Sequence, residues 1–144
     1  MAHCELETSS DLRDLERICA FVRKFCQEVQ RPPLDEESTL KIELAVNEAA
    51  SNIMRHAYGG RPDQRILVKL ESLSHQISIQ LCHSGASFDM PPIREPELET
   101  SGEGGLGLYI ISRCVDEVRY CRDEKGRSCT CLIKRLHHNP REGR

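Results

Sequence analysis

Apolar residues recur at helical intervals in two stretches of the N-terminal half of the chain. The first covers residues 11–29, with Ser9 and Ser10 placed before it as candidate N-caps. The second starts near Asp35 or Ser38 and continues to about Tyr58. The prolines between the two stretches and the glycines after the second interrupt the pattern. We therefore predict two consecutive helices.

Apolar and polar residues alternate strictly in the segments that follow, which is the pattern of half-buried strands. Residues 65–72 and 76–83 predict an antiparallel hairpin, and residues 3–8 predict a possible additional strand. A helical pattern returns at residues 106–115, and two more strands are predicted at residues 116–123 and 127–136. This order indicates an α+β fold in which helices pack on one face of a mostly antiparallel sheet.

A long segment without regular pattern, SGASFDMPPIREPELETSGEGG, precedes the third helix. It ends in a cluster of glycines, Gly102, Gly104, Gly105 and Gly107, which would let backbone N–H groups approach an anion at a helix N-terminus. Residues 102–107 match G-x-G-x-x-G, but no strand directly precedes them, so a Rossmann site is disfavoured. The phosphate-binding G-x-x-x-x-G-K-[ST] and the V-A-I-K and H-R-D kinase motifs are absent from the sequence. A glycine-rich hinge is the alternative interpretation.

Two polar stripes follow the second predicted helix beside its apolar face. Glu48, Asn52 and His56 form one stripe, and Glu43, Asn47 and Ser51 form the other. Either stripe could be a solvated face, and periodicity does not choose between them. The first stripe offers a base, a neutral oxygen ligand and a hydrogen-bond donor in consecutive turns, which favours a functional site there.

Length and charge narrow the classes of protein that the chain can belong to. With 144 residues and 38% apolar residues, we expect one domain over residues 1–136 and a flexible tail over 137–144. The net charge of −3 argues against direct nucleic-acid binding, and we expect no membrane span and a cytoplasmic location. The eight cysteines lack C-x-x-C spacing, so we expect structural thiols, with metal binding or redox sensing as the alternative.

Two segments together resemble a known family. NEAASNIMRHAY at residues 47–58 and GEGGLGLYIISRCVDEV at residues 102–118 are similar to the N-box and the second glycine box of the GHKL ATP-binding fold. Within that fold, the chain looks most like the anti-sigma-factor serine kinases of bacterial stress and sporulation switches, from about residue 5 to residue 136. The resemblance implies a two-layer α/β sandwich of the histidine-kinase-like ATPase type.

The resemblance also implies a set of site residues. Glu48 matches the family's catalytic base, Asn52 matches its Mg²⁺ ligand, and His56 falls near the site. Residues 86–104 would form the ATP lid. The ATP-binding positions carried over from the glycine box are Gly102, Gly104, Gly105, Leu106 and Gly107.

One motif departs from the family pattern. Where the first glycine box of the family reads D-x-G-x-G, this chain has His83-Ser84-Gly85-Ala86-Ser87. His83 and Gly85 therefore stand at ATP-binding positions, but a neutral imidazole carries no fixed negative charge for the adenine amino group.

The implied function is that of an anti-sigma factor with ATP- and Mg²⁺-dependent serine kinase activity. Its expected partners are an anti-sigma-factor antagonist, phosphorylated on serine, and a sigma factor that it sequesters, and the protein is expected to be a homodimer. The altered first glycine box leaves one alternative, a degenerate protein-binding regulator without ATP turnover. A detached ATPase domain of a sensor histidine kinase is a further alternative, disfavoured because this chain shows no phosphoacceptor helix pair of its own.

Overall fold

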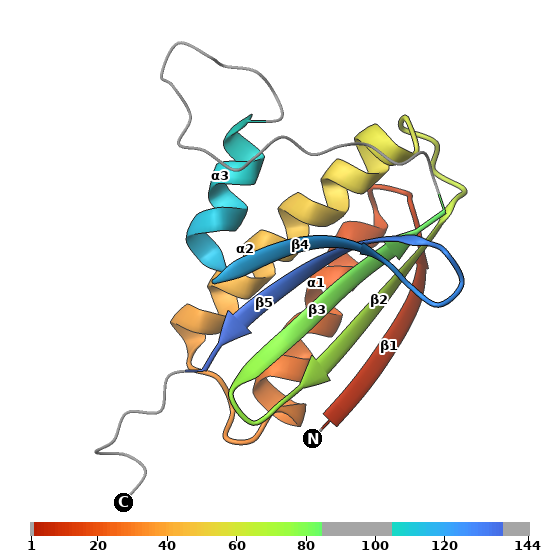
Figure 1. The fold of residues 1–144 in the computed structure, drawn as a ribbon. Coiled ribbons are helices and arrows are strands. Elements are labelled where there is room, and N and C mark those ends of the chain that lie inside the picture. Colours follow the sequence, from red (N-terminus) through yellow and green to blue (C-terminus); the bar gives the residue numbers. More distant parts are fainter. Residues whose placement is uncertain (1, 85–104, 137–144) are drawn as a thin grey trace, which may run out of the picture.

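One antiparallel sheet, covered by helices on one face, forms the protein in the computed structural model, which describes residues 2–84 and 105–136 (Figure 1). The sheet has the strand order β1-β2-β3-β5-β4, and every neighbouring pair is antiparallel. The strands are β1 (Ala2–Ser9), β2 (Arg65–Ser72), β3 (Gln76–His83), β4 (Glu117–Arg122) and β5 (Ser128–Arg135). The helices are α1 (Asp14–Lys24), α2 (Glu36–Asn52) and α3 (Gly105–Cys114). The predicted α+β class and the additional N-terminal strand are confirmed.

Successive side chains of each strand point to opposite faces of the sheet. On the helix-covered face, Val68, Leu70, Ile79, Leu81 and Leu132 join the main core. Ile18 and Val22 of α1, Ile42 and Val46 of α2, and Ile111 of α3 meet them from the helical layer. Each fully buried side chain of this kind contributes about 1.5–3 kcal/mol relative to exposure. The core therefore fixes α2 and α3 side by side on the sheet.

The helix boundaries differ from the prediction at the first helix. Ser9 does not cap it: the helix begins at Asp14, and both the hydroxyl and the backbone N–H of Ser9 donate to the Asp14 carboxylate. The hydroxyl of Ser10 donates instead to the backbone carbonyl of Arg61. At α2 the predicted cap is confirmed, because the Asp35 side chain accepts a hydrogen bond from the Ser38 N–H.

Both α1 and α2 continue into a single π-helical turn, over Phe25–Val29 and Ile53–Ala57 respectively. Such turns contain one more residue per hydrogen-bonded ring than α-helix and so rotate the side chains that follow. The second turn changes the face on which residues after Asn52 lie.

The cysteines are of two kinds. Cys26 and Cys114 are buried thiols, as expected, and desolvation by burial, aided by the charge of Glu43, raises the pKa of Cys26 to about 12. Cys82 and Cys129, however, form a disulfide. The expectation of unlinked structural thiols is wrong for this pair, because β3 and β5 place the two residues directly opposite each other, a pairing that linear spacing does not reveal.

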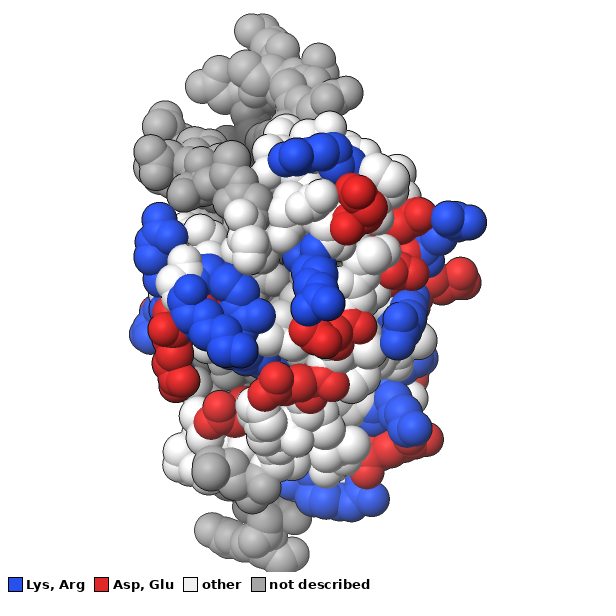
Figure 2. Space-filling model, turned by 90° about the vertical axis from the view of Figure 1, so that its right-hand side faces the viewer, with Lys and Arg blue, Asp and Glu red and all other residues white. Residues whose placement is uncertain are grey.

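Charged residues of both signs are interspersed on the side of the molecule that carries the β1 edge (Figure 2). Among the described residues, no helix has the length and apolar character needed to cross a bilayer. The predicted lid at 86–104 and the predicted tail at 137–144 lie outside the described residues, so the domain boundary at 136 stays a prediction.

Candidate functional site

Glu48 and Asn52 of α2 face the beginning of α3 at Gly107. A Cβ atom built on Gly107 would lie 2.9 Å from the Glu48 Oε2 atom and 3.9 Å from both the Oδ1 and Nδ2 atoms of Asn52. The carboxylate and the amide therefore lie against the backbone of the glycine-rich helix start, and a side chain at 107 would enter the space between them. The two motifs that the sequence suggested are brought together in space.

Glu48 is partly exposed, whereas Asn52 is only 3% exposed. A buried amide needs hydrogen-bond partners, and the Oδ1 atom of Asn52 accepts one from Nη2 of Arg55 at 3.0 Å. Arg55 is a site residue that the sequence pattern did not indicate. Its position three residues after Asn52 is the signal that could have identified it, because residues at i and i+3 are neighbours on a helix surface.

The second polar stripe of α2 packs against α1 instead of forming a site. Arg23 of α1 donates from Nη2 to Oε2 of Glu43 at 2.9 Å, and the Cys19 Sγ atom lies 3.9 Å from Oδ1 of Asn47. These contacts join the two helices. Packing therefore decides between the stripes, and it leaves Glu48 and Asn52 to face α3.

His56 is exposed and lies within the π-helical turn that follows Asn52. In an uninterrupted α-helix it would continue the stripe of Glu48 and Asn52 one turn on. The wider turn rotates its position relative to that stripe. Its place near the site and its role therefore stay predictions.

His83, at the end of β3, is 3% exposed and packs edge-on against the ring of Tyr58, with ring centroids 5.8 Å apart. Desolvation by burial lowers the pKa of His83 below its ordinary value of 6.5, so the imidazole is held neutral. The Tyr58 hydroxyl donates to the carbonyl of Arg65 and accepts from the N–H of Ser84 at 2.9 Å. Tyr58 thus fixes the position where β3 leads into the altered first glycine box.

Of the remaining predicted ATP-binding positions, only some lie in the part of the chain that the structure describes. Gly85, Gly102 and Gly104 lie outside the described residues. Gly105 is the first residue of α3 and Leu106 the second. The N-terminal turn of this helix presents backbone N–H groups without helical partners, which is the arrangement that binds phosphate oxygens.

The site combines groups that suit a magnesium–nucleotide complex. Asn52 supplies a neutral oxygen of the kind that Mg²⁺ accepts beside phosphate oxygens, and Gly107 leaves the space that a side chain would fill. Glu48 supplies a carboxylate that can accept a proton. The donor set and the glycine cradle fit the cofactors that the sequence predicted.

Comparison with known proteins agrees with this geometry. The family described as the histidine kinase-like ATPase domain matches residues 8–134. A serine-protein kinase RsbW of Listeria innocua is 28% identical over 96 residues, 61% of each chain. The RsbW of Oceanobacillus iheyensis is 32% identical over 91 residues, 58% of each chain. The chain thus aligns with about three fifths of the length of these relatives.

A solved structure shows the same fold. The crystal structure of the RsbU and RsbW domains of Rv1364c from Mycobacterium tuberculosis superposes with a TM-score of 0.65 at 15% identity, covering 94% of this chain and 32% of that one. At this identity the likeness concerns the fold. The protein therefore belongs to the histidine kinase-like ATPase domain family.

Proposed function

We propose that this protein is an anti-sigma factor with ATP-dependent serine kinase activity. The observation that carries the proposal is that the Glu48 carboxylate and the Asn52 amide lie next to Gly107. Two motifs that are far apart in the sequence meet there. The kinase names of the relatives support the same reaction.

Each residue of the site has a distinct proposed role. Glu48 accepts the proton of the acceptor serine hydroxyl, since its side chain is partly exposed whereas that of Asn52 is buried. Asn52 would hold Mg²⁺ through its amide oxygen, and the N-terminal turn of α3 would donate backbone N–H groups to phosphate oxygens. Bound ATP would supply the phosphoryl group, and Mg²⁺ would neutralise the charge that develops on it.

Arg55 constrains the metal site. Its guanidinium occupies Oδ1 of Asn52 at 3.0 Å, the atom proposed to hold Mg²⁺. Two cations do not share one amide oxygen without strong repulsion. We therefore expect the Arg55 side chain to move away from Oδ1 when Asn52 takes up a metal ion.

The proposed partners follow from the relatives and not from a docked surface. The acceptor is a small anti-sigma-factor antagonist phosphorylated on serine, and the second partner is a sigma factor held inactive. The active form is proposed to be a homodimer.

Phosphate transfer to an antagonist protein tests the proposal. With ATP and Mg²⁺, Glu48→Gln is expected to lower the transfer rate by about 10²–10⁴-fold while nucleotide binding persists, because only the base is lost. Asn52→Ala is expected to lose magnesium-dependent nucleotide binding as well. Glu37→Gln, an exposed substitution at the beginning of α2, serves as the matched control and should transfer normally. Wild-type transfer by Glu48→Gln would remove Glu48 from this role.

The altered first glycine box favours a second candidate function, a regulator that binds its partner without ATP turnover. The buried, neutral His83 stands where the family has a carboxylate. Calorimetry with ATP and Mg²⁺ tests the second function. Micromolar ATP binding, about −8 kcal/mol, would exclude a regulator that acts without nucleotide. A protein that binds its partner but not ATP would favour that regulator.

A further inference from the structure

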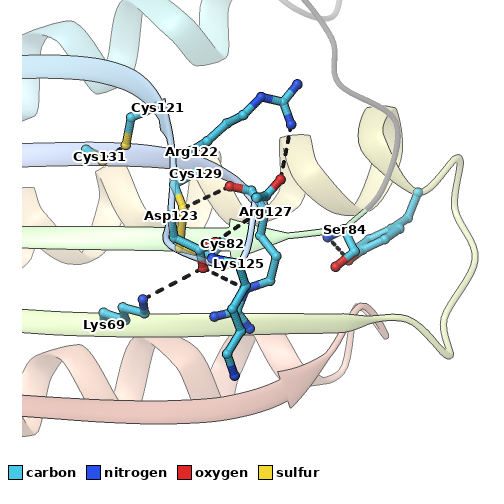
Figure 3. Close-up of a disulfide and its surroundings, with 12 residues drawn as sticks. Lys69, Cys82, Ser84, Cys121, Arg122, Asp123, Lys125, Arg127, Cys129 and Cys131 are labelled. Carbon is cyan, nitrogen blue, oxygen red and sulfur yellow. Dashed lines mark hydrogen bonds and ion pairs between the residues drawn. A yellow bond between two sulfur atoms is a disulfide. The ribbon is translucent and has the colours of Figure 1, made fainter.

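Four cysteines gather on the helix-free face of the sheet, away from the nucleotide site (Figure 3). Cys82 on β3 lies directly opposite Cys129 on β5, and Cys129 lies directly opposite Cys121 on β4. Cys131 follows two residues after Cys129 and shares its face. Three adjacent strands thus place four sulfur atoms in one cluster, which none of the roles proposed above uses.

The Cys82–Cys129 disulfide is the protected part of this cluster. The two residues are 1% and 3% exposed, and a carboxylate oxygen of Asp123 lies within 4.8 Å of both sulfurs. The Asp123 carboxylate is bound by Arg127 at 2.6 Å and by Lys69 at 3.8 Å. Burial of Cys82 and Cys129 therefore shields the disulfide from thiols in solution. The disulfide and the paired carboxylate also leave no free thiolate or uncompensated oxygen there for a metal ion.

Cys121 and Cys131 form the reactive part. Their Sγ atoms are 2.9 Å apart, which is on the order of 1 Å longer than a disulfide bond. Cys121 is exposed, whereas Cys131 is 6% exposed. Desolvation, followed by the hydrogen bond with Cys121 and the charge of Cys121, raises the pKa of Cys131 to about 12, so Cys131 stays protonated. Cys121 is the thiol that an external reagent reaches first.

We propose that Cys121 and Cys131 are a redox-active dithiol, which hydroperoxides oxidise to a second cross-strand disulfide between β4 and β5. The inference stands on the sulfur cluster alone and does not depend on the proposed kinase function.

The reaction balances with hydrogen peroxide as the oxidant. The Cys121 thiolate attacks one peroxide oxygen, giving the sulfenic acid and releasing hydroxide, which becomes water. The Cys131 sulfur then attacks the Cys121 sulfur, and the sulfenic hydroxyl leaves with the Cys131 proton as a second water. In sum, the two thiols lose two hydrogen atoms, and one peroxide is reduced to two waters.

Thiol mapping of the full chain tests the proposal. The protein, with its Cys82–Cys129 disulfide intact and Cys121 and Cys131 reduced, is treated with a small excess of hydrogen peroxide. It is then alkylated in denaturant and digested, and its linked peptides are identified by mass. A Cys121–Cys131 peptide is expected to form faster than modification of Cys4, a partly buried thiol on β1 that lies opposite Leu70 of β2. In Cys131→Ser, Cys121 is expected to stop at a sulfenic acid that dimedone traps.

Matched variants make the outcome decisive. Cys121→Ser should abolish the second disulfide, whereas Cys4→Ser should leave it unchanged. A Cys121–Cys129 linkage in place of Cys121–Cys131, oxidation of Cys121 no faster than that of Cys4, or stoichiometric zinc protecting the cluster from alkylation would each overturn the proposal.

Discussion

At the scale of single residues, the site depends on a glycine whose missing side chain leaves room for two others. The space at Gly107 is bounded by the end of the Glu48 side chain and by the Asn52 amide. Gly107 lies inside α3, so the helix does not need the conformational freedom of glycine at this position. The absence of a side chain instead allows α2 to approach closely.

Gly107→Ala should separate stability from activity. Alanine favours a helix interior over glycine by about 0.8–1 kcal/mol, and the contact at 2.9 Å is with the movable end of Glu48, so the melting temperature should not fall. The displaced carboxylate should lower phosphate transfer by roughly 10²-fold, because small misplacements of a catalytic group are costly. Ser112→Ala in the same helix is the control, since the Ser112 hydroxyl donates to the carbonyl of Tyr109 within α3. Unchanged transfer by Gly107→Ala would show that Glu48 needs no such space.

His83→Asp tests the altered first glycine box. It would place a carboxylate where the family has one, beside the ring of Tyr58. We expect ATP to bind several-fold more tightly, since hydrogen bonds to charged groups contribute about 1.5–3 kcal/mol, part of which the burial of the carboxylate offsets. Calorimetry measures the change, with His83→Asn as the neutral control. Equal ATP affinity in the two variants would mean that position 83 does not contact the base.

At the scale of elements, α2 is the part that the sequence predicted best. Its apolar face, its two polar stripes and two candidate starts, Asp35 and Ser38, were visible in the linear pattern, and the structure selects Asp35 as the cap. The linear pattern did not show which stripe faces the site, because both stripes have the same periodicity and only the positions of α1 and α3 distinguish them. The π-helical turn after Asn52 was also not visible, since no glycine or proline marks it.

Asp35→Ala should weaken α2 from its first turn. The Asp35 side chain accepts from the Ser38 N–H, and removal of such a cap costs about 0.5–2 kcal/mol of the free energy of unfolding. Urea unfolding at neutral pH measures the loss. Asp35→Asn should recover most of it, because asparagine caps as well as aspartate. An equal loss in both variants would point to the charge of Asp35 and not to its cap.

At the scale of the whole molecule, buried and hydrogen-bonded titrating groups set the pH range of stability. Burial lowers the pKa of His83, so the unfolded chain binds its proton at higher pH than the folded protein does. Hydrogen bonds from Ser9 and Thr8 lower the pKa of Asp14. For Asp123, desolvation acts in the opposite direction, but hydrogen bonds from Arg127 and Lys125 outweigh it and the pKa is lowered.

All three lowered pKa values make the free energy of unfolding fall as the pH falls. The stability that they contribute is present above the unfolded pKa and is lost as the pH falls, first below 6.5 for His83 and then below 3.8 for Asp14 and Asp123. The free energy of unfolding should therefore be lower at about pH 5 than at about pH 7.5. Urea titrations at both values measure this, and His83→Phe, which keeps an aromatic ring beside Tyr58, should reduce the difference. A pH dependence identical to that of the wild type would assign the effect to other groups.

The sequence by itself determined the order of helices and strands, the antiparallel sheet with one helical face, and the two motifs that mark the family. These features depend on local periodicity, capping and turn residues, which act over a few positions of the chain. The tertiary structure alone decided that Glu48 and Asn52 meet Gly107, that Arg55 holds the Asn52 oxygen, and that Cys82 pairs with Cys129. The physical reason is that packing of α2 against α3, and the register of β3 against β5, join residues that are far apart in the chain.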